Sequence, residues 1–459
     1  MLSLPGAIVG LRTSARAADA HSAAGMLVAF CVPLTTRRPN HNLDLPRFVK
    51  QLGPGLITGA ADDDPSGIAT YSVTGASFGY GLLWTALLSF PMMAAVQLMC
   101  ARLARVTGKG LAAVIRGRYS RGVLWTACLL LVVANVFNIG ADLAGMGEVT
   151  AMLTGHNSLL FTPVYMAIIV VLLFWGSYRT IAGIFKWLTL VLFAYVATAF
   201  LAKPDWAAAV RGTLVPHMHW SAAYLSVLVG VFGTTISPYL FFWQAAEEVE
   251  EERALKKAVP NGRKAPLRER LRQTRTDVLT GMSFSNVVMY FIILTTAATL
   301  HAHGVTQIAS AREAAEALRP LAGNYAYWLF AIGVIGTGML AVPVLAGSSA
   351  FAISEAMRWR ASLDRPPRLA REFYLVLGAA LALGLGLDYA RIDVVKMLFW
   401  SAVLNGVLAP PLVALVVSLT SDTQVMGPHA NSRTMRWLGW LTAGVMTFAA
   451  GALLITEWL

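Results

Sequence analysis

Apolar residues occur along the chain in long runs separated by short polar segments. Eleven such runs follow residue 50, and most approach the roughly 20 residues that an α-helix needs to cross about 30 Å of hydrocarbon. None alternates as a strand of a transmembrane barrel does. Backbone polar groups in lipid must be satisfied within the segment, so we expect helices. The predicted spans lie near residues 53–73, 81–103, 123–150, 159–176, 185–202, 222–245, 279–300, 325–352, 372–388, 395–419 and 435–457.

Composition supports an all-α integral membrane protein. The chain is 57% hydrophobic and 13% charged, whereas soluble domains have about 45–50% apolar and about 25% charged residues. Its three cysteines provide no disulfide framework. The first 50 residues are polar and basic, and we expect them to form a mobile N-terminal tail. Residues 51–459 are predicted to form one transmembrane domain.

The basic residues predict the orientation of the spans. The net charge is +12, and 30 of the 36 Lys and Arg residues lie in the N-terminal tail or near the connections after spans 2, 4, 6, 8 and 10. Because cytoplasmic loops are enriched in Lys and Arg, we expect a cytoplasmic N-terminus and an external C-terminus. Topology thus explains the charge without a nucleic-acid partner. The compact loops fit a bacterial inner membrane.

The connection after span 6 is long and begins with an acidic run, residues 247–252. A helix that continues out of span 6 accounts for this run. Its carboxylates are expected to form a solvated cytoplasmic face or, alternatively, an acidic collar that receives cations.

Span 1 is predicted to be interrupted at Asp62-Asp63-Asp64-Pro65. Proline removes a backbone donor and disfavours the helical conformation of the residue before it. Charged groups within a membrane are costly and are functional candidates. Carboxylates beside freed backbone carbonyls provide hard oxygen ligands, so we expect a cation site here.

Span 6 contains a second break, at residues 233–238, where Gly-Thr-Thr-Ile precedes Ser-Pro. Interrupted segments at matching positions of two halves indicate the midplane site of a secondary transporter. The spacing of five spans predicts two five-helix repeats of inverted topology. Repeat one would cover residues 51–202 and repeat two 222–419, with an eleventh helix at 435–457.

The motifs at these positions resemble those of the natural resistance-associated macrophage protein (NRAMP) family of divalent metal transporters. Residues 53–65 resemble the first-helix signature, and residues 233–239 stand where the family has Gly-Ala-Thr-Val-Met-Pro-His. Ala-Asp-Leu-Ala at 141–144 and Asn-Val-Val-Met at 286–289 resemble two further motifs. The resemblance implies a leucine-transporter-like fold. It also implies metal ligation by the Asp64 carboxylate and by the carbonyls of Ala61 and Thr234.

Several positions depart from the family pattern. Gly67 replaces an Asn ligand, Ser237 replaces a Met ligand, and Gly145 replaces an acidic residue. The chain therefore resembles the NRAMP-related magnesium transporters more than the manganese and iron importers. A thioether favours transition metals, whereas a hydroxyl is a hard ligand. With space at Gly67 for a water that Mg²⁺ retains, this site suits Mg²⁺, with Mn²⁺ as the second candidate.

The resemblance also places two residues on a candidate proton path. Asp142 matches a family residue of that path, although a structural role within the helix bundle is equally compatible with its position. Tyr239 replaces the family's histidine. The amides Asn135 and Asn138, one helical turn apart in the third predicted span, are expected to join helices by hydrogen bonds.

These observations predict a secondary transporter that moves divalent metal cations by alternating access. The alternative is a carrier of an organic solute, such as an amino acid, with a coupling cation on the same fold. Phosphate-binding and metalloprotease motifs are absent from the sequence, which argues against an ATP-driven pump or an enzyme. The expected partners are divalent cations, as cargo rather than cofactor, and the lipid bilayer. A monomer is compatible with the sequence.

Overall fold

The computed structural model describes residues 53–175, 189–258, 266–390 and 392–458. The chain divides into Met1–Phe48 and Val49–Leu459, and all described residues belong to the second unit. The predicted tail, residues 1–50, lies outside the described residues. Every regular element in the described ranges is an α-helix or a 3-10 helix, which agrees with the predicted all-α class.

Long helices coincide with apolar runs, and short ones lie between them. The α-helices are α3 (Pro54–Asp62), α4 (Pro65–Phe78), α5 (Trp84–Thr107), α6 (Leu111–Arg118), α7 (Arg121–Thr154), α8 (Thr162–Trp175), α10 (Phe193–Leu201), α11 (Trp206–Leu214), α12 (Ala222–Thr235), α13 (Pro238–Ala258), α14 (Leu267–Thr299), α15 (Ala311–Glu316), α16 (Arg319–Ala322), α17 (Ala326–Met357), α18 (Arg371–Asp388), α19 (Val394–Ser421), α20 (Thr423–Met426) and α21 (Arg433–Trp458). The 3-10 helices are η1 (Gly79–Leu82), η2 (Ser158–Leu160), η3 (Thr189–Leu192), η4 (His301–His303), η5 (Gly323–Tyr325), η6 (Pro367–Leu369) and η7 (Gly427–His429).

Seven helical segments of the described chain are long and apolar enough to cross a membrane. They include α5, α7, α14, α17, α19, α21 and the combined α12 and α13. Shorter apolar helices occupy Ser158–Phe174 and Leu190–Leu201, and the first predicted span is divided into α3 and α4. The total of eleven spans, the inverted repeats and the sidedness therefore stay predictions.

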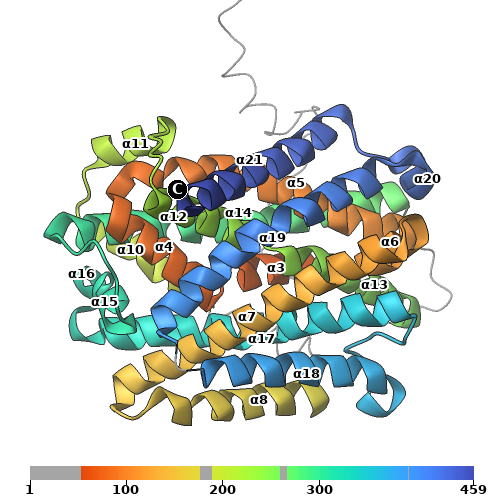
Figure 1. Cartoon of the computed structure of the whole chain (residues 1–459), viewed down its shortest axis with the longest axis horizontal. Helices are drawn as coiled ribbons and strands as arrows, with labels where there is room; N and C mark the ends of the chain where they lie inside the picture. The colour runs from red at the N-terminus through yellow and green to blue at the C-terminus, as the bar shows by residue number, and fades with distance from the viewer. Residues whose placement is uncertain (1–52, 176–188, 259–265, 391, 459) are drawn as a thin grey trace, which may run out of the picture. The chain divides into compact units, whose positions relative to one another are not determined.

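The interrupted helices lie inside the bundle. Helix α14 packs along α3 and α4, and α12 packs on α4 and α19. Figure 1 shows α7 and α17 side by side, with α18 and α8 next to them on the side away from α3. Close approach of α3 and α14 depends on glycines, because a Cβ at Gly59 would lie 2.2 Å from the carbonyl oxygen of Gly281. Small residues of this kind let membrane helices pack closely.

Helix α13 continues beyond the apolar part of span 6, as the sequence predicts, but two of its acidic side chains are not solvated. Glu248 is 1% exposed and Glu250 is 6% exposed. Glu248 forms an ion pair with Arg105 of α5, and Glu250 accepts a hydrogen bond from Ser362. The prediction of a solvated face is therefore wrong at these positions, because basic and hydroxyl groups from other segments cover them.

The same end of the bundle holds the start of α3. The carboxylate of Asp277, on α14, accepts hydrogen bonds from the backbone N–H groups of Gly53 and Gly55 at 2.8 and 2.6 Å. It thereby satisfies donors that a helix leaves free in its first turn. Thr58 of α3 also donates to Gln244 of α13 at 2.6 Å. This end, which the charge pattern predicts to be cytoplasmic, is closed by these contacts.

Polar side chains join the long helices in the interior. The amide of Asn135 on α7 donates to the hydroxyls of Ser348 and Ser349 on α17, at 2.8 and 2.9 Å. Asn138 and Asn405 exchange hydrogen bonds between α7 and α19. These contacts confirm the predicted role of the interior asparagines in helix packing.

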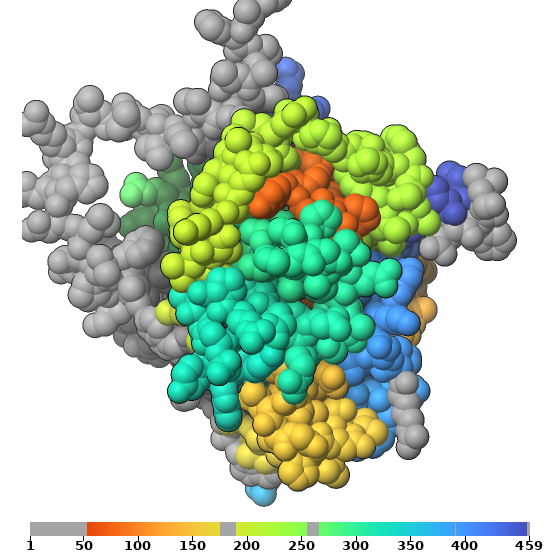
Figure 2. All heavy atoms as spheres, turned by 90° about the vertical axis from the view of Figure 1, so that its left-hand side faces the viewer, coloured from red at the N-terminus to blue at the C-terminus, as the bar shows by residue number. Residues whose placement is uncertain are grey.

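The opposite end is covered by short helices. Figure 2 shows the segment that includes α15 and α16 between the one that includes α11 and the one that includes η2. The charge pattern predicts that this end is external.

Candidate metal site at two helix breaks

The first break separates α3 from α4. Helix α3 ends at Asp62, and Pro65 begins α4, so the backbone of Asp63 and Asp64 is not helical. Asp64 caps α4, since its Oδ1 accepts a hydrogen bond from the N–H of Gly67 at 2.7 Å. Proline suits the first position of a helix, where no backbone donor is needed. The structure therefore confirms that the helix is interrupted here and that the Asp64 carboxylate lies at the interruption.

The second break separates α12 from α13. Helix α12 ends at Thr235, Ile236 has φ −121° and ψ 53°, and Pro238 begins α13. The Ser237 hydroxyl contacts the carbonyl oxygens of Gly233 and Thr234 at 2.9 and 2.7 Å. The Ser237 hydroxyl thus provides a hydrogen-bond donor to carbonyl oxygens at the end of α12. The carbonyl of Thr234 and the hydroxyl of Ser237, two predicted ligands, lie in contact.

The two breaks meet at Gly67. A Cβ at this glycine would lie 2.9 Å from Oγ1 of Thr234 and 3.4 Å from both the Asp62 carbonyl oxygen and Asp64 Oδ1. Oxygens from both interrupted helices therefore surround the face of Gly67. The missing side chain lets these oxygens approach closely, and a Cβ here would require the Thr234 side chain to move.

Tyr239, in the first turn of α13, connects the two breaks directly. It is completely buried. Its hydroxyl lies 2.9 Å from the carbonyl oxygen of Ala61 and 3.3 Å from Asp64 Oδ2. A tyrosine has one O–H donor, so the Ala61 carbonyl and the Asp64 carboxylate, both predicted ligands, share the Tyr239 proton. The hydroxyl contacts the oxygens that a bound ion would need.

Asp142 faces this region from the middle of α7. The side chain is completely buried, has no hydrogen-bonded side-chain partner among the described residues, and interacts with Asp64 and with the backbone N–H of Ser66. Its position fits the predicted proton path as well as a structural role. Gly145, one turn further along α7, is closely packed: a Cβ there would lie 3.4 Å from the Pro65 side chain.

Two side chains at the first break were not predicted from the sequence. The Ser285 hydroxyl of α14 contacts Asp62 Oδ2 at 2.6 Å and Asp63 Oδ1 at 3.2 Å. Tyr71 of α4 is completely buried and lies beside Asp62 and Asp63. The only signal for Ser285 is that it directly precedes the Asn-Val-Val-Met motif at 286–289.

Within the described chain, no group of three or more His, Cys, Asp or Glu residues is arranged to hold one metal ion. An ion at the breaks would instead be ligated by a carboxylate with carbonyl and hydroxyl oxygens. Oxygen ligands of this kind suit Mg²⁺, Ca²⁺ and Mn²⁺.

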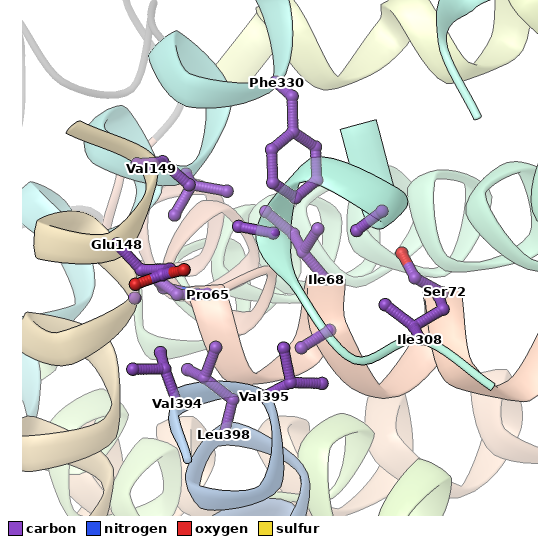
Figure 3. Close-up of a pocket in the computed structure, with 15 residues that line it drawn as sticks. Pro65, Ile68, Ser72, Glu148, Val149, Ile308, Phe330, Val394, Val395 and Leu398 are labelled. Atoms are coloured by element: carbon purple, nitrogen blue, oxygen red, sulfur yellow. The ribbon is translucent and has the colours of Figure 1, made fainter. Parts of the chain in front are cut away.

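A cavity leads to the first break from the end predicted to be external. It is narrow, with a volume of about 30 Å³, reaches Pro65, and is mostly apolar apart from Glu148 and Ser72. Figure 3 shows the Glu148 carboxylate beside Pro65. A second cavity of about 310 Å³ shares Glu148 and is also lined by Asp388 and Asp393.

The sequence profile of the family described as "Natural resistance-associated macrophage protein-like" matches residues 55–456. The chain belongs to the NRAMP family. The match includes both helix breaks, and it confirms the resemblance that the motifs indicate.

Bacterial members of the NRAMP family match over nearly their full length. The "Divalent metal cation transporter MntH" of Yersinia pestis (strain Pestoides F) is 29% identical over 429 residues, which cover 92% of this chain and 98% of that protein. The protein of the same name from Klebsiella pneumoniae (strain 342) is 28% identical, with coverage of 88% and 93%. Both are named as transporters rather than enzymes.

Solved structures share the fold. The Eremococcus coleocola manganese transporter has a TM-score of 0.68 at 19% identity, with coverage of 91% of this chain and 88% of the other. The nucleobase-cation-symport-1 family transporter Mhp1 has a TM-score of 0.53 at 16% identity, with coverage of 88% and 91%. This NRAMP family member therefore has the architecture of secondary transporters with interrupted helices.

Proposed function

We propose that the protein is a secondary transporter that moves a divalent metal cation, Mg²⁺ or Mn²⁺, across the membrane by alternating access. The observation that carries this proposal is that oxygens of both helix breaks face Gly67, namely the Thr234 hydroxyl, the Asp62 carbonyl oxygen and Asp64 Oδ1. Asp64 supplies the charge, while Ala61, Thr234 and Ser237 supply neutral oxygens. Family membership and the names of the bacterial relatives support a divalent metal as cargo.

The ligand types favour a hard cation. The proposed set contains oxygen atoms and no thioether, so it lacks the soft ligand that selects transition metals. Mg²⁺ keeps part of its water shell and is typically held by one or two carboxylates. Mn²⁺ accepts the same oxygen ligands, and a manganese transporter is among the proteins of the same fold.

The two ends of the bundle support alternating access. The end near Asp277 and Arg105 is closed by capping contacts and ion pairs. The opposite end has the cavity that reaches Pro65, and the larger cavity beside it is lined by three carboxylate side chains. A negatively charged entrance attracts cations. We therefore interpret this conformation as closed on the predicted cytoplasmic side, with a route from the predicted external side.

Uptake by the purified full-length protein in liposomes tests the proposal. Mg²⁺, Mn²⁺ and Ca²⁺ are compared as substrates, with and without a mixture of amino acids. Metal uptake that saturates and does not need the organic mixture is the expected result. Metal uptake that occurs only together with an amino acid would favour an organic solute carrier instead.

A further inference from the structure

Asp62 and Asp63 form a pair of buried carboxylates beside the proposed divalent site. Both side chains are completely buried, and both point to Ser285 of α14, at 2.6 and 3.2 Å. Asp62 Oδ1 and Asp63 Oδ2 have no hydrogen-bond partner within the described part of the chain. The pair therefore keeps unsatisfied oxygens in the protein interior.

Ser285 cannot satisfy both carboxylates. A serine hydroxyl carries one proton, and an ionised carboxylate only accepts hydrogen bonds. When both carboxylates are ionised, one of the two contacts to Ser285 therefore pairs acceptor atoms with no hydrogen between them. A cation between these oxygens would turn the contact into a favourable one.

A further hydroxyl faces the same group of oxygens. Tyr71 is completely buried, and its hydroxyl makes no hydrogen bond of normal geometry within the described residues. It lies beside Asp62, Asp63 and Thr234. Tyr71 belongs to α4 and Ser285 to α14, so the unsatisfied oxygens converge from separate elements.

Charge balance indicates which kind of cation fits. Asp62, Asp63 and Asp64 are adjacent and completely buried, and none forms an ion pair with a basic side chain of the described residues. Burying an unpaired charge costs several kcal/mol. Asp142 of α7 is a fourth buried carboxylate that interacts with Asp64. A divalent ion at Asp64 and one monovalent cation between Asp62 and Asp63 balance three of the four negative charges, and one proton balances the fourth.

We infer that Asp62, Asp63, Ser285 and Tyr71 form a second cation site that binds Na⁺ and couples it to metal transport. The inference rests on the proposed function for the coupling, although not for the binding of Na⁺ itself. Carboxylate and hydroxyl oxygens are hard ligands and suit this ion. A second divalent ion would be repelled by the first more strongly than a monovalent ion would.

Two measurements on the purified full-length protein test this site. Binding of ²²Na⁺ is measured in the absence of divalent metal, by a scintillation proximity assay. Uptake of ⁵⁴Mn²⁺ into liposomes is then measured with external Na⁺, K⁺ or choline. With one Na⁺ per cycle, a tenfold inward Na⁺ gradient raises the limiting accumulation of Mn²⁺ up to about tenfold, since 1.4 kcal/mol corresponds to a factor of ten.

The variants separate the two sites. Asp62→Asn/Asp63→Asn and Ser285→Ala are expected to lose ²²Na⁺ binding and the Na⁺ dependence of uptake while still binding ⁵⁴Mn²⁺. Ser285→Thr keeps a hydroxyl and is expected to retain the Na⁺ effect. Glu355→Gln, which changes a carboxylate of α17 that accepts a hydrogen bond from the Ala113 N–H away from the breaks and the external cavities, is the matched control and is expected to behave as wild type.

Each outcome bears on the inference. Wild-type protein that binds no ²²Na⁺ and takes up Mn²⁺ equally in Na⁺, K⁺ and choline would show that the carboxylate pair holds protons only. Retained Na⁺ dependence in both the double variant and Ser285→Ala would place the Na⁺ site elsewhere. If the wild type binds Na⁺ but no divalent metal, the proposed function fails and the second site stands.

Discussion

The hydroxyl of Tyr239 lies 3.3 Å from Oδ2 of Asp64. The same hydroxyl lies 2.9 Å from the carbonyl oxygen of Ala61. Helix α13 is thereby joined to the break of the first interrupted helix through two proposed metal ligands. An ion that binds Asp64 and Ala61 must compete with the Tyr239 hydroxyl. The hydrogen bonds of this hydroxyl therefore reduce the affinity for the ion.

Removing that hydroxyl is therefore expected to tighten metal binding. A hydrogen bond contributes about 0.5–1.5 kcal/mol net. Tyr239→Phe should raise the affinity for Mn²⁺ by about two- to tenfold, because 1.4 kcal/mol is a factor of ten. Isothermal titration calorimetry of the purified protein measures the change.

The control for this prediction is Tyr374→Phe. Tyr374 of α18 also donates to a backbone carbonyl, that of Arg365, at 2.9 Å, but it lies outside both breaks, so its loss should leave Mn²⁺ affinity unchanged. Weaker Mn²⁺ binding by Tyr239→Phe would mean that the tyrosine oxygen is itself a ligand.

The residue at position 237 is expected to tune selectivity. Ser237→Met places a soft thioether where the hydroxyl contacts the Thr234 carbonyl, and it should shift preference from Mg²⁺ toward Cd²⁺ and Mn²⁺. The expected change is about 1–3 kcal/mol of differential binding, the usual size of coupling between sites. Competition of Cd²⁺ against ⁵⁴Mn²⁺ uptake provides the measurement.

Ser237→Ala separates the gain of sulfur from the loss of the serine cap. It should weaken binding of all the ions without a preference for Cd²⁺. If Cd²⁺ competes equally well before and after the methionine substitution, residue 237 does not face the ion.

Proton coupling is expected to be weak. Tyrosine's reference pKa near 10 makes it a poor proton carrier at neutral pH, and the position three residues after Asp142 is Gly145, packed against Pro65. A divalent cation that enters at about −100 mV gains roughly 4.6 kcal/mol, twice the value for one charge. That energy supports more than about a thousandfold accumulation.

Liposomes that contain a pH-sensitive dye report this coupling during metal uptake. Little acidification is expected, and Asp142→Asn should leave it unchanged. Strong acidification in proportion to metal entry, abolished by Asp142→Asn, would show instead that this single carboxylate is enough for a proton path.

Both helix breaks could be predicted because their causes are local. Pro65 and Pro238 each begin a helix, and the residues directly before them, Asp64 and Ser237, leave the helical conformation and cap the adjacent ends. The apolar runs likewise report helices directly, since each span is a continuous segment of the chain.

Contacts between distant segments could not be predicted in the same way. Ser285 meets Asp62 across 223 residues, and Asp277 caps Gly55 across 222. Neither contact leaves a local pattern in the sequence. Glu248 shows the same limit, because its acidic neighbours suggest a solvated face while Arg105, from another helix, buries it in an ion pair.

Binding of ⁵⁴Mn²⁺ by Asp64 variants tests the proposed site most directly. Asp64→Asn keeps an oxygen that can cap α4 but removes the charge, whereas Asp64→Ala removes both; loss of a cap costs about 1 kcal/mol. Both variants are expected to reach the membrane folded, as judged by gel filtration, and to lose metal binding and uptake. Glu355→Gln should match the wild type. Wild-type affinity for Mn²⁺ in folded Asp64→Ala would contradict a metal site at the two helix breaks.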